Sequence, residues 1–503
     1  MNTNTDEVEQ ETNNKINGDQ LIGMGWEAGK PLGLALRAAA QLQVDGASTS
    51  AILQTLDAVR KHPMAYLSDG VLGELANAFH LTQTRVAESM GAELRAQPLP
   101  YPVWGSAGID EGSRRQMDNA MRLPVSVAGA LMPDAHVGYG LPIGGVLATE
   151  GAVIPYAVGV DIACRMRLTV FEASPIVLGQ QKDKFEKMLR NNTRFGAGVE
   201  WNPRMEDAVM DDEDWNAHGL IKKLKDKAWR QLGTSGSGNH FVEFGELEII
   251  EDANAVVETR RGSSLPAKGK YLALLSHSGS RGFGAQIAGH YSTLAKNMHP
   301  ELAKAGGDLS HLGWLPMDSA PGQEYWLAMN LAGKYAQANH RVIHKSITKA
   351  CGLDVAATIE NHHNFAWKEV LEDGAGNRRE VFVHRKGATP AGTGVLGIIP
   401  GSMGDPGYVV RGRGVAASLN SASHGAGRLM SRTKANQTIT KTMRDAYLRE
   451  KGVTLLGGGL DEAPQAYKNI NEVIAAQSDL VDILARFMPR VVMMDGSGSG
   501  QDI

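Results

Sequence analysis

Seven loops rich in glycine and polar residues hold nearly all the side chains of this sequence that could do chemistry. Each contains at least one residue able to bind a metal ion or a phosphate. The chain has 59 glycines in 503 residues, well above the usual roughly 7%. Such an excess indicates backbone that turns sharply or approaches a ligand closely. The loops are 132–145, 157–164, 233–243, 276–284, 360–365, 384–408 and 421–432.

The metal-binding candidates are Asp161 and Cys164, which follow an apolar run at a predicted strand-to-loop junction, and three histidines in other loops, His240, His277 and His363. A thiolate, a carboxylate and several imidazoles suit a divalent first-row ion, and a bridging thiolate could hold two ions. Any one of these histidines alone is typical of a hydrogen-bonded histidine in a turn. Five ligand-type residues in similar loops favour a metal site, although spacing alone does not show that they converge.

Two other histidine pairs need an interpretation. His340 and His344 have the four-residue spacing of a helical metal pair. No glutamate lies between them and basic residues flank both, so we predict a solvated helix face. His362 directly precedes His363, and only one of the two need point inward.

Phosphate binding is indicated by three glycine-rich runs whose backbone amides could form anion-binding nests. Arg281, Arg428 and Arg432 are possible partners for the phosphate. A single run of this kind is weak evidence, because glycine loops also make ordinary turns. The runs are GTSGSGN (233–239), HSGSRG (277–282) and PGSMGDPG (400–407).

The run SASHGAGRLMSR, residues 421–432, is typical of a loop that enters a helix. It would place His424 at the positive helix end, where a phosphate is stabilised. Arg428 and Arg432 would lie one turn apart and could both bind phosphate oxygens. A histidine in this position can attack phosphorus and form a phosphoramidate, or can merely donate to a phosphate.

Length and composition limit the possible domain organisation, cellular location and partners of the protein. At 503 residues, one large catalytic domain with an appendage is expected. The 42% hydrophobic and 21% charged residues are ordinary for a globular protein. There is no apolar stretch of membrane-spanning length, no signal-peptide pattern and no disulfide framework in two cysteines, so we expect a cytoplasmic protein. With a net charge of −4, a nucleic acid would need a local basic groove.

Three regions are predicted along the chain. Residues 1–20 are expected to be a disordered tail, because they offer little to bury. Residues 21–98 form a helical region of unknown role, with Ser48 or Thr49 as a helix N-cap. Residues 99–503 form an α+β domain with strands in GGVLAT, VFVHR and RVVMM, a long helix over 323–350, and a charged surface helix over 202–227.

From Val103 to Gly496, about four-fifths of the chain, the sequence resembles the RtcB family of RNA-splicing ligases. The resemblance implies the α+β fold of that family, with a central cleft that holds two manganese ions. Its motifs occur in the family's order, and only their combination is specific. They are PDAHVGYGLPIGG, VGVDIAC, GNHFVE, SHSGSRG, HHN, HRKGATPAGTG, IPGSMG and SHGAGR.

Carried over residue by residue, the resemblance implies that His424 becomes guanylylated. It also implies five manganese ligands, with Cys164 bridging, and favours His363 over His362 because His363 precedes Asn364. The ligands are Asp161, Cys164, His240, His277 and His363. The nucleotide-contacting positions are Asn239, Glu243, Ser402, His424, Ala426, Gly427 and Tyr467, and the phosphate- or RNA-binding positions are Arg281, Arg428 and Arg432.

The implied activity is a GTP- and manganese-dependent RNA ligase of tRNA splicing or RNA repair. It would join a 2′,3′-cyclic phosphate or 3′-phosphate end to a 5′-hydroxyl end through a guanylylated histidine. An activating partner like the family's archease is a candidate as well. Two alternatives remain open: a relative that only caps or hydrolyses RNA ends, and a non-catalytic RNA-binding protein.

Two positions depart from the family. Where the family has a lysine that contacts the guanine base, this chain has Asp495, and a serine expected five residues after Ser402 is Gly407. Both changes fall on nucleotide recognition, whereas the metal ligands and the nucleophile are present. Guanine specificity is therefore less secure than the ligase-type chemistry.

Overall fold

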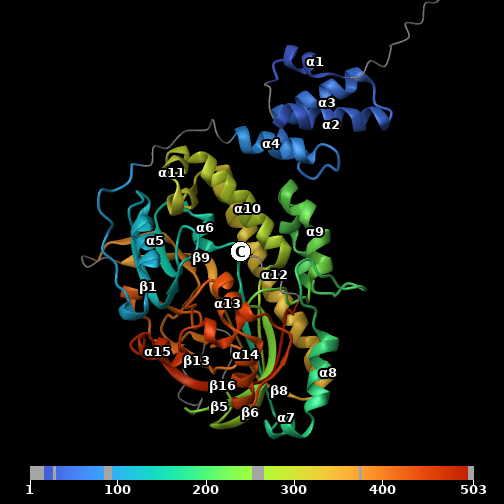
Figure 1. The fold of residues 1–503 in the computed structure, drawn as a ribbon. Helices are drawn as coiled ribbons and strands as arrows, with labels where there is room; N and C mark the ends of the chain where they lie inside the picture. Colours follow the sequence, from blue (N-terminus) through green and yellow to red (C-terminus); the bar gives the residue numbers. More distant parts are fainter. Residues whose placement is uncertain (1–15, 27–29, 84–92, 252–264, 373–375, 497–503) are drawn as a thin grey trace, which may run out of the picture. The chain divides into compact units, whose positions relative to one another are not determined.

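The computed structural model describes residues 16–26, 30–83, 93–251, 265–372 and 376–496. The chain divides into two compact units (Figure 1). The first comprises Met1–Ser89 and Trp215–Leu224, and the second comprises Met90–Asp214 and Lys225–Ile503. No helix among the described residues is both long and apolar enough to cross a membrane.

The first unit contains a small set of helices around an apolar core that includes Leu21, Leu56 and Leu75. Ser48 is the N-cap of α3, as predicted, and its Oγ accepts a hydrogen bond from the Ala51 N–H at 3.3 Å. The expected tail falls largely on residues 1–15, outside the described residues, but α1 already begins at Gly18 because Asn17 caps it. The helices are α1 (Gly18–Gly23), α2 (Lys30–Val44), α3 (Thr49–Lys61), η1 (Pro63–Tyr66) and α4 (Gly73–Gln83).

An eight-stranded sheet is the centre of the second unit, which is a mixed α+β fold as predicted. Its pairings are antiparallel except for β15, which runs parallel to β16. In order, the strands are β12 (Leu396–Ile399), β13 (Gly407–Gly412), β16 (Val481–Met494), β5 (Phe241–Ile249), β6 (Gly269–Ser278), β4 (Arg165–Phe171) and β8 (Val355–His362), with β15 (Thr454–Leu456) beside β16.

Asn361 links the two ends of this sheet. Its Oδ1 accepts a hydrogen bond from the Ile398 N–H of β12 at 2.9 Å, and its Nδ2 donates to Thr389 Oγ1 at 2.8 Å. The buried amide thus joins β8 to β12, so the open sheet is nearly closed into a barrel.

A second, four-stranded sheet has the order β1-β2-β10-β9, and two short ribbons pair β11 with β14 and β3 with β7. The predicted strands GGVLAT, VFVHR and RVVMM are confirmed as parts of β2, β10 and β16. The strands are β1 (Ser126–His136), β2 (Ile143–Thr149), β9 (Asn364–Glu372), β10 (Arg378–Lys386), β11 (Ala388–Pro390), β14 (Ser421–Ser423), β3 (Ala152–Val153) and β7 (Leu315–Pro316).

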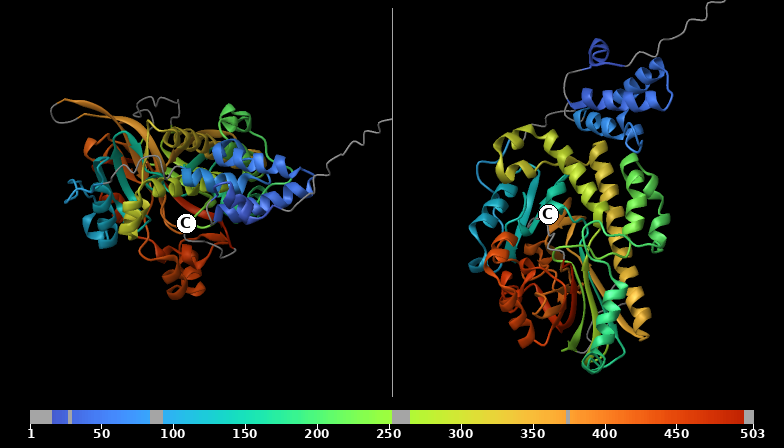
Figure 2. Two further views of the ribbon diagram at one scale, coloured as in Figure 1. Left: turned by 90° about the horizontal axis from the view of Figure 1, so that it is seen from above. Right: turned by 45° about the vertical axis from the view of Figure 1, so that its right-hand side comes forward.

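The longest helix, α12 (Ala320–Cys351), confirms the helix predicted over 323–350. It runs along the large sheet beside β4 and β6 (Figure 1 and Figure 2). The charged segment 202–227 forms two short 3-10 turns, Ala208–Asp211 and Glu213–Asn216, before α9 (Gly219–Gln231) begins. Other helices used below are α10 (Arg281–Met298), α13 (Arg432–Thr438) and α14 (Lys441–Glu450).

The solvated helix face predicted for His340 and His344 is wrong, because this face of α12 is buried against the sheet. Ser276 Oγ lies 2.7 Å from His340 Nδ1 and 2.8 Å from His344 Nε2. The other ring nitrogens are 3.0 Å from the Ser278 carbonyl oxygen and 2.7 Å from Thr169 Oγ1. Burial lowers the pKa of both imidazoles well below the usual range, so they are neutral members of a satisfied hydrogen-bond network.

Replacing Asn361 tests the closure of the sheet. Asn361→Ala leaves the Ile398 N–H without its partner in a buried position, which costs roughly 1–3 kcal/mol. We expect a melting temperature several degrees below that of the wild type in a thermal scan, and no change for Asn191→Ala, an exposed residue of α8 (Lys182–Asn192). Equal melting temperatures for both variants would show that the side chain does not link the strands.

Candidate functional site

A cavity of about 720 Å³ lies in the second unit and draws its lining from loops far apart in the sequence. Nearly all of the site residues predicted from the sequence line it. The exception is Arg281, whose Nη1 lies 3.2 Å from His240 Nδ1 and so reaches the site from outside the lining. The predicted residues in the lining are Asp161, Cys164, Asn239, His240, Glu243, His277, His363, Ser402, His424, Ala426, Gly427, Arg428, Arg432 and Tyr467.

The first group of possible metal ligands is Asp161, Cys164 and His240. His240 Nε2 lies 2.9 Å from Asp161 Oδ2 and 3.4 Å from Cys164 Sγ. Burial opposes ionisation of Asp161, but the hydrogen bond with His240, the nearby positive charges and the contact with Cys164 together outweigh it and lower the pKa of the carboxyl to about 2. An anionic oxygen, an imidazole nitrogen and a sulfur therefore lie close enough together to bind one metal ion.

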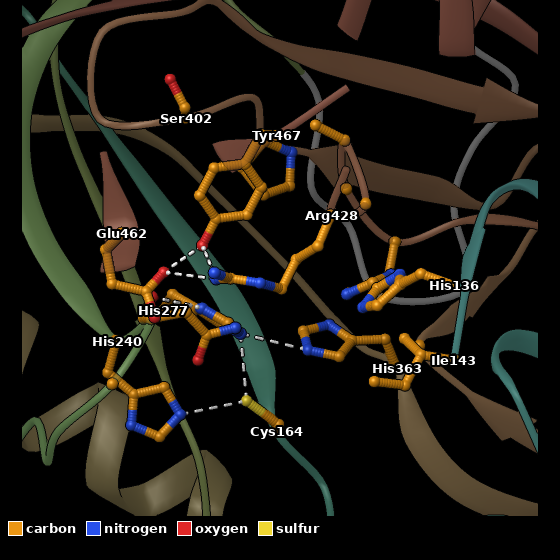
Figure 3. A pocket seen from close by; sticks show the side chains of 18 of the residues that line it. His136, Ile143, Cys164, His240, His277, His363, Ser402, Arg428, Glu462 and Tyr467 are labelled. Carbon is orange, nitrogen blue, oxygen red and sulfur yellow. Dashed lines mark hydrogen bonds and ion pairs between the residues drawn. The ribbon is translucent and has the colours of Figure 1, made fainter. Parts of the chain in front are cut away.

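The second group is Cys164, His277 and His363. His277 Nε2 lies 3.0 Å from Cys164 Sγ and 3.1 Å from His363 Nε2, so Cys164 stands between the two groups (Figure 3). Burial lowers the pKa of His277 to about 3 and that of His363 well below its usual range. Both rings are neutral, the state in which imidazole binds a metal.

Cys164 is suited to bridge two cations. Burial and the neighbouring Asp161 carboxylate raise the pKa of its thiol well above the usual range. A thiolate needs a positive charge nearby to form in such a place, and coordination to a metal supplies it. One group adds an oxygen and a nitrogen to this sulfur and the other adds two nitrogens, a set that fits a pair of divalent first-row ions.

The strand register brings these ligands together. Cys164 directly precedes β4, His240 directly precedes β5, His277 lies near the end of β6, and His363 directly follows β8. These strands are neighbours in the antiparallel order β5-β6-β4-β8, so all four residues meet at one end of the sheet. The predicted strand-to-loop junction at Asp161 and Cys164 is reversed, because the loop leads into the strand.

Asn364 holds the loop that carries Asp161. Its Nδ2 donates to the Asp161 carbonyl oxygen at 3.2 Å, and its carbonyl accepts from the Ala163 N–H at 2.7 Å. The His363 N–H donates to the Cys164 carbonyl at 3.0 Å. Backbone contacts between the two loops thus keep the carboxylate, the thiol and the imidazole in register.

His424 is oriented by Asp134, a residue that carries no predicted role. His424 Nδ1 lies 2.7 Å from Asp134 Oδ2, and the backbone N–H groups of His424 and Gly425 donate to the same oxygen at 3.2 and 3.4 Å. Burial alone would raise the pKa of Asp134, but the hydrogen bond and charge of His424 outweigh it and the pKa is lowered. The carboxylate therefore fixes the orientation of the imidazole through Nδ1.

The expectation that His424 lies at a helix N-terminus is wrong. Helix α13 begins only at Arg432, where Ser431 accepts from the Lys434 N–H. Between His424 and the helix the chain makes a β-bridge from Arg428 to Tyr467, with Gly427 in the left-handed region at φ 75°. A Cβ there would lie 2.0 Å from the Asp134 carbonyl oxygen. A buried carboxylate, instead of a helix end, orients the histidine.

Arg428 and Arg432 both meet an acidic pair that the sequence analysis did not identify. Arg432 Nη1 lies 2.7 Å from Asp461 Oδ2 and also pairs with Glu462. Arg428 Nη1 lies 3.5 Å from Glu462 Oε2 and 3.3 Å from Tyr467 Oη (Figure 3). The two arginines are therefore held by Glu462 and not by a shared helix face, and a bound phosphate would share them with it.

Glycine at position 236 is required for the approach of Arg281. A Cβ on Gly236, whose φ is 93°, would lie 1.9 Å from Arg281 Nη2. The run GTSGSGN therefore packs its backbone directly on the guanidinium that reaches His240. Of the two departures from the family, Gly407 lines the cavity, whereas Asp495 follows the lining residue Met494 and is itself outside the lining.

Comparison with known proteins gives one consistent result. The family model described as tRNA-splicing ligase RtcB matches residues 116–495. RNA-splicing ligase RtcB1 of Escherichia coli (strain ATCC 25922) is 31% identical over 418 residues, which are 78% of this chain and 96% of that protein. RNA-splicing ligase RtcB of Mycobacterium tuberculosis is 32% identical over 74% of this chain and 98% of its own length. tRNA-splicing ligase RtcB of Nanoarchaeum equitans is 32% identical over 78% and 95%.

The shared sulfur predicts how metal binding responds to substitution. Dialysed protein should bind two divalent ions such as Mn²⁺ per chain in an EPR titration. Cys164→Ala should lower the affinity for both ions by roughly tenfold or more, because each group loses its sulfur. Asp161→Ala should lower the affinity for only one of the two ions. His362→Ala is the control, because its ring packs on Phe365 and Trp367 and belongs to neither group. Two tight ions in Cys164→Ala would contradict the shared site.

Proposed function

The chain belongs to the RtcB family, and we propose that it is an RNA ligase that uses GTP and manganese to join RNA ends through a guanylylated His424. One observation carries the proposal. Two groups of possible metal ligands share Cys164, and the ring of His363 in one group lies 4.9 Å, centroid to centroid, from the ring of His424. A nucleophilic histidine beside a two-cation site suits the transfer of phosphorus-containing groups.

The cation-binding residues we propose are Asp161, Cys164 and His240 for one manganese ion, and Cys164, His277 and His363 for the other. Bound there, the ions would neutralise phosphate charge and polarise P–O bonds. The neutral imidazoles and the sulfur suit such an ion better than magnesium, which prefers oxygen ligands.

His424 is the proposed nucleophile towards GTP. Asp134 keeps the proton on Nδ1, so Nε2 can attack the α-phosphorus. An N–P bond forms, the bond from that phosphorus to the bridging oxygen breaks, and pyrophosphate leaves. Asp134 also stabilises the positive charge that develops on the imidazole, as the buried aspartate of a serine-protease triad does.

The RNA steps begin with hydrolysis and then use this intermediate. A water oxygen attacks the phosphorus of the 2′,3′-cyclic phosphate, the bond to the 2′ oxygen breaks, and that oxygen takes the proton, which leaves a 3′-phosphate. An oxygen of that 3′-phosphate attacks the phosphorus held by His424, the N–P bond breaks, and the guanylyl group passes to the RNA end. The 5′-hydroxyl of the second end then attacks the RNA phosphate, loses its proton, and releases GMP as the phosphodiester forms.

Negative charge builds around phosphorus in each of these steps, and the proposal assigns its binding to the arginines of the cavity. Arg428 and Arg432 line it, and Arg281 reaches it through His240. Guanidinium groups bind phosphate oxygens with two parallel hydrogen bonds, which orients as well as neutralises them. Arg428 and Arg432 are paired with Asp461 and Glu462, so a bound phosphate would share them with these carboxylates.

Covalent labelling tests the nucleophile. With Mn²⁺ and GTP labelled at the α-phosphate, the protein should acquire a label that acid removes and base does not, as a phosphoramidate does. His424→Ala should remove the label. Asp134→Asn should slow labelling by at least about 100-fold, because an amide can hold the wrong tautomer, while manganese binding stays intact.

An RNA with a 2′,3′-cyclic phosphate and a 5′-hydroxyl then tests the joining reaction. Circular RNA separated on a gel supports ligation. Capped or dephosphorylated linear RNA alone would favour the end-modifying alternative, and a label that persists in His424→Ala would remove His424 as the nucleophile.

A further inference from the structure

One end of the cavity offers a place for a planar base. Its apolar lining consists of Phe241, Met403 and Met494, which belong to one hydrophobic cluster. Met403 comes from the loop between β12 and β13, and Phe241 and Met494 are paired across β5 and β16. The same loop contributes Ser402 and Asp405 to the lining, so polar groups stand at the edge of an apolar surface.

Asp405 is held in place by two hydroxyl groups. Ser402 Oγ donates to Oδ2 and Tyr447 Oη donates to Oδ1, each at 2.5 Å. The Asp405 N–H donates to the Ser402 carbonyl oxygen at 3.1 Å and closes the turn. No lysine, arginine or histidine among the described residues forms an ion pair with it. Both donors are neutral hydroxyl groups.

Each carboxylate oxygen has two acceptor positions. Because Ser402 and Tyr447 take one position on each oxygen, one acceptor position remains on each. Guanine presents a matching pair of donors, its N1–H and its exocyclic amine. Adenine presents an N1 lone pair at the corresponding place, which an anionic oxygen repels.

The departures from the family leave this end of the cavity without its expected donors. At Gly407 a Cβ would come within 3.3 Å of Pro400 Cα, so the loop is packed closely where a serine is expected. Asp495 stands where the family has a lysine and lies outside the lining. Glu243 does line the cavity, and burial raises its pKa well above the usual range. A protonated Glu243 can donate to a carbonyl oxygen such as guanine O6.

We propose that Asp405 determines the base specificity of this protein by accepting hydrogen bonds from the N1–H and the exocyclic amine of guanine. The inference rests on the proposed function, because it assigns the base of the nucleotide used there. It makes this chain a guanine-selective enzyme that reads the base with a different residue from the lysine that its family uses.

The test compares GTP, inosine triphosphate and ATP, in direct binding by calorimetry and in labelling of His424. Inosine keeps the N1–H and lacks the exocyclic amine, so the wild type should bind it about tenfold more weakly than GTP, since one hydrogen bond to a charged group is lost. ATP should bind more weakly still. In Asp405→Asn, the affinity for GTP should fall by about 100-fold, and the affinity for ATP should not fall. The difference in affinity between GTP and inosine triphosphate should largely disappear.

Two further variants separate a role in reading the base from a structural one. Tyr447→Phe removes a supporting hydrogen bond but keeps the carboxylate. It should therefore lower the affinity for all three nucleotides modestly and preserve their order of affinity. Asp445→Asn, on the same helix and paired with Arg444 away from the cavity, should leave every value unchanged.

Three results would overturn the proposal. They are equal wild-type affinity for GTP and inosine triphosphate, an unchanged order of preference in Asp405→Asn, and loss of order in Tyr447→Phe alone. The first needs no variant, so a folding defect cannot hide the answer. Guanine-selective binding without any labelling of His424 would support Asp405 and contradict the proposed chemistry, whereas labelling without selectivity would do the reverse.

Discussion

Cys164 Sγ lies 3.0 Å from His277 Nε2 and 3.4 Å from His240 Nε2, and the rest of the site depends on this crowding. A sulfur, an ionised carboxylate and three imidazoles face one another on the wall of the cavity, and all but the carboxylate are buried. Burying polar groups in this way is unfavourable unless they are hydrogen-bonded or bound to a metal. Divalent cations bound there would resolve the conflict, and they would also attract the phosphates on which His424 is proposed to act.

The fold supports this crowded point from two sides. The ends of β4, β5, β6 and β8 fix the ligands, and α12 packs behind β4 and β6 with His340 and His344 bonded to Ser276. On the other side, Asp134 holds His424 while the Lys468 ammonium donates to the Pro133 and Ala135 carbonyls at 3.1 and 2.7 Å. Such outer contacts orient the groups that meet the substrate, and their loss weakens metal binding or activity.

Local sequence patterns predicted the elements well, because capping and periodicity are local. Ser48 as an N-cap and the helix now seen as α12 are examples. The metal-ligating residues could also be identified from the sequence, and the order of the motifs indicated the family. That these residues lie close together could not be predicted, because it depends on the register of four antiparallel strands. Asp134 and His424 meet across 290 positions, and the burial of His340 depends on which face α12 turns to the sheet, which its flanking charges did not reveal.

The most direct test is a crystal structure of the protein with Mn²⁺ and a GTP analogue, using anomalous scattering at the manganese edge. We expect two anomalous peaks, both within bonding distance of Cys164 Sγ, one beside Asp161 and His240 and the other beside His277 and His363. The α-phosphate should face His424 Nε2. A single peak, or two peaks of which one lacks contact with Cys164, would contradict the shared sulfur on which the account rests.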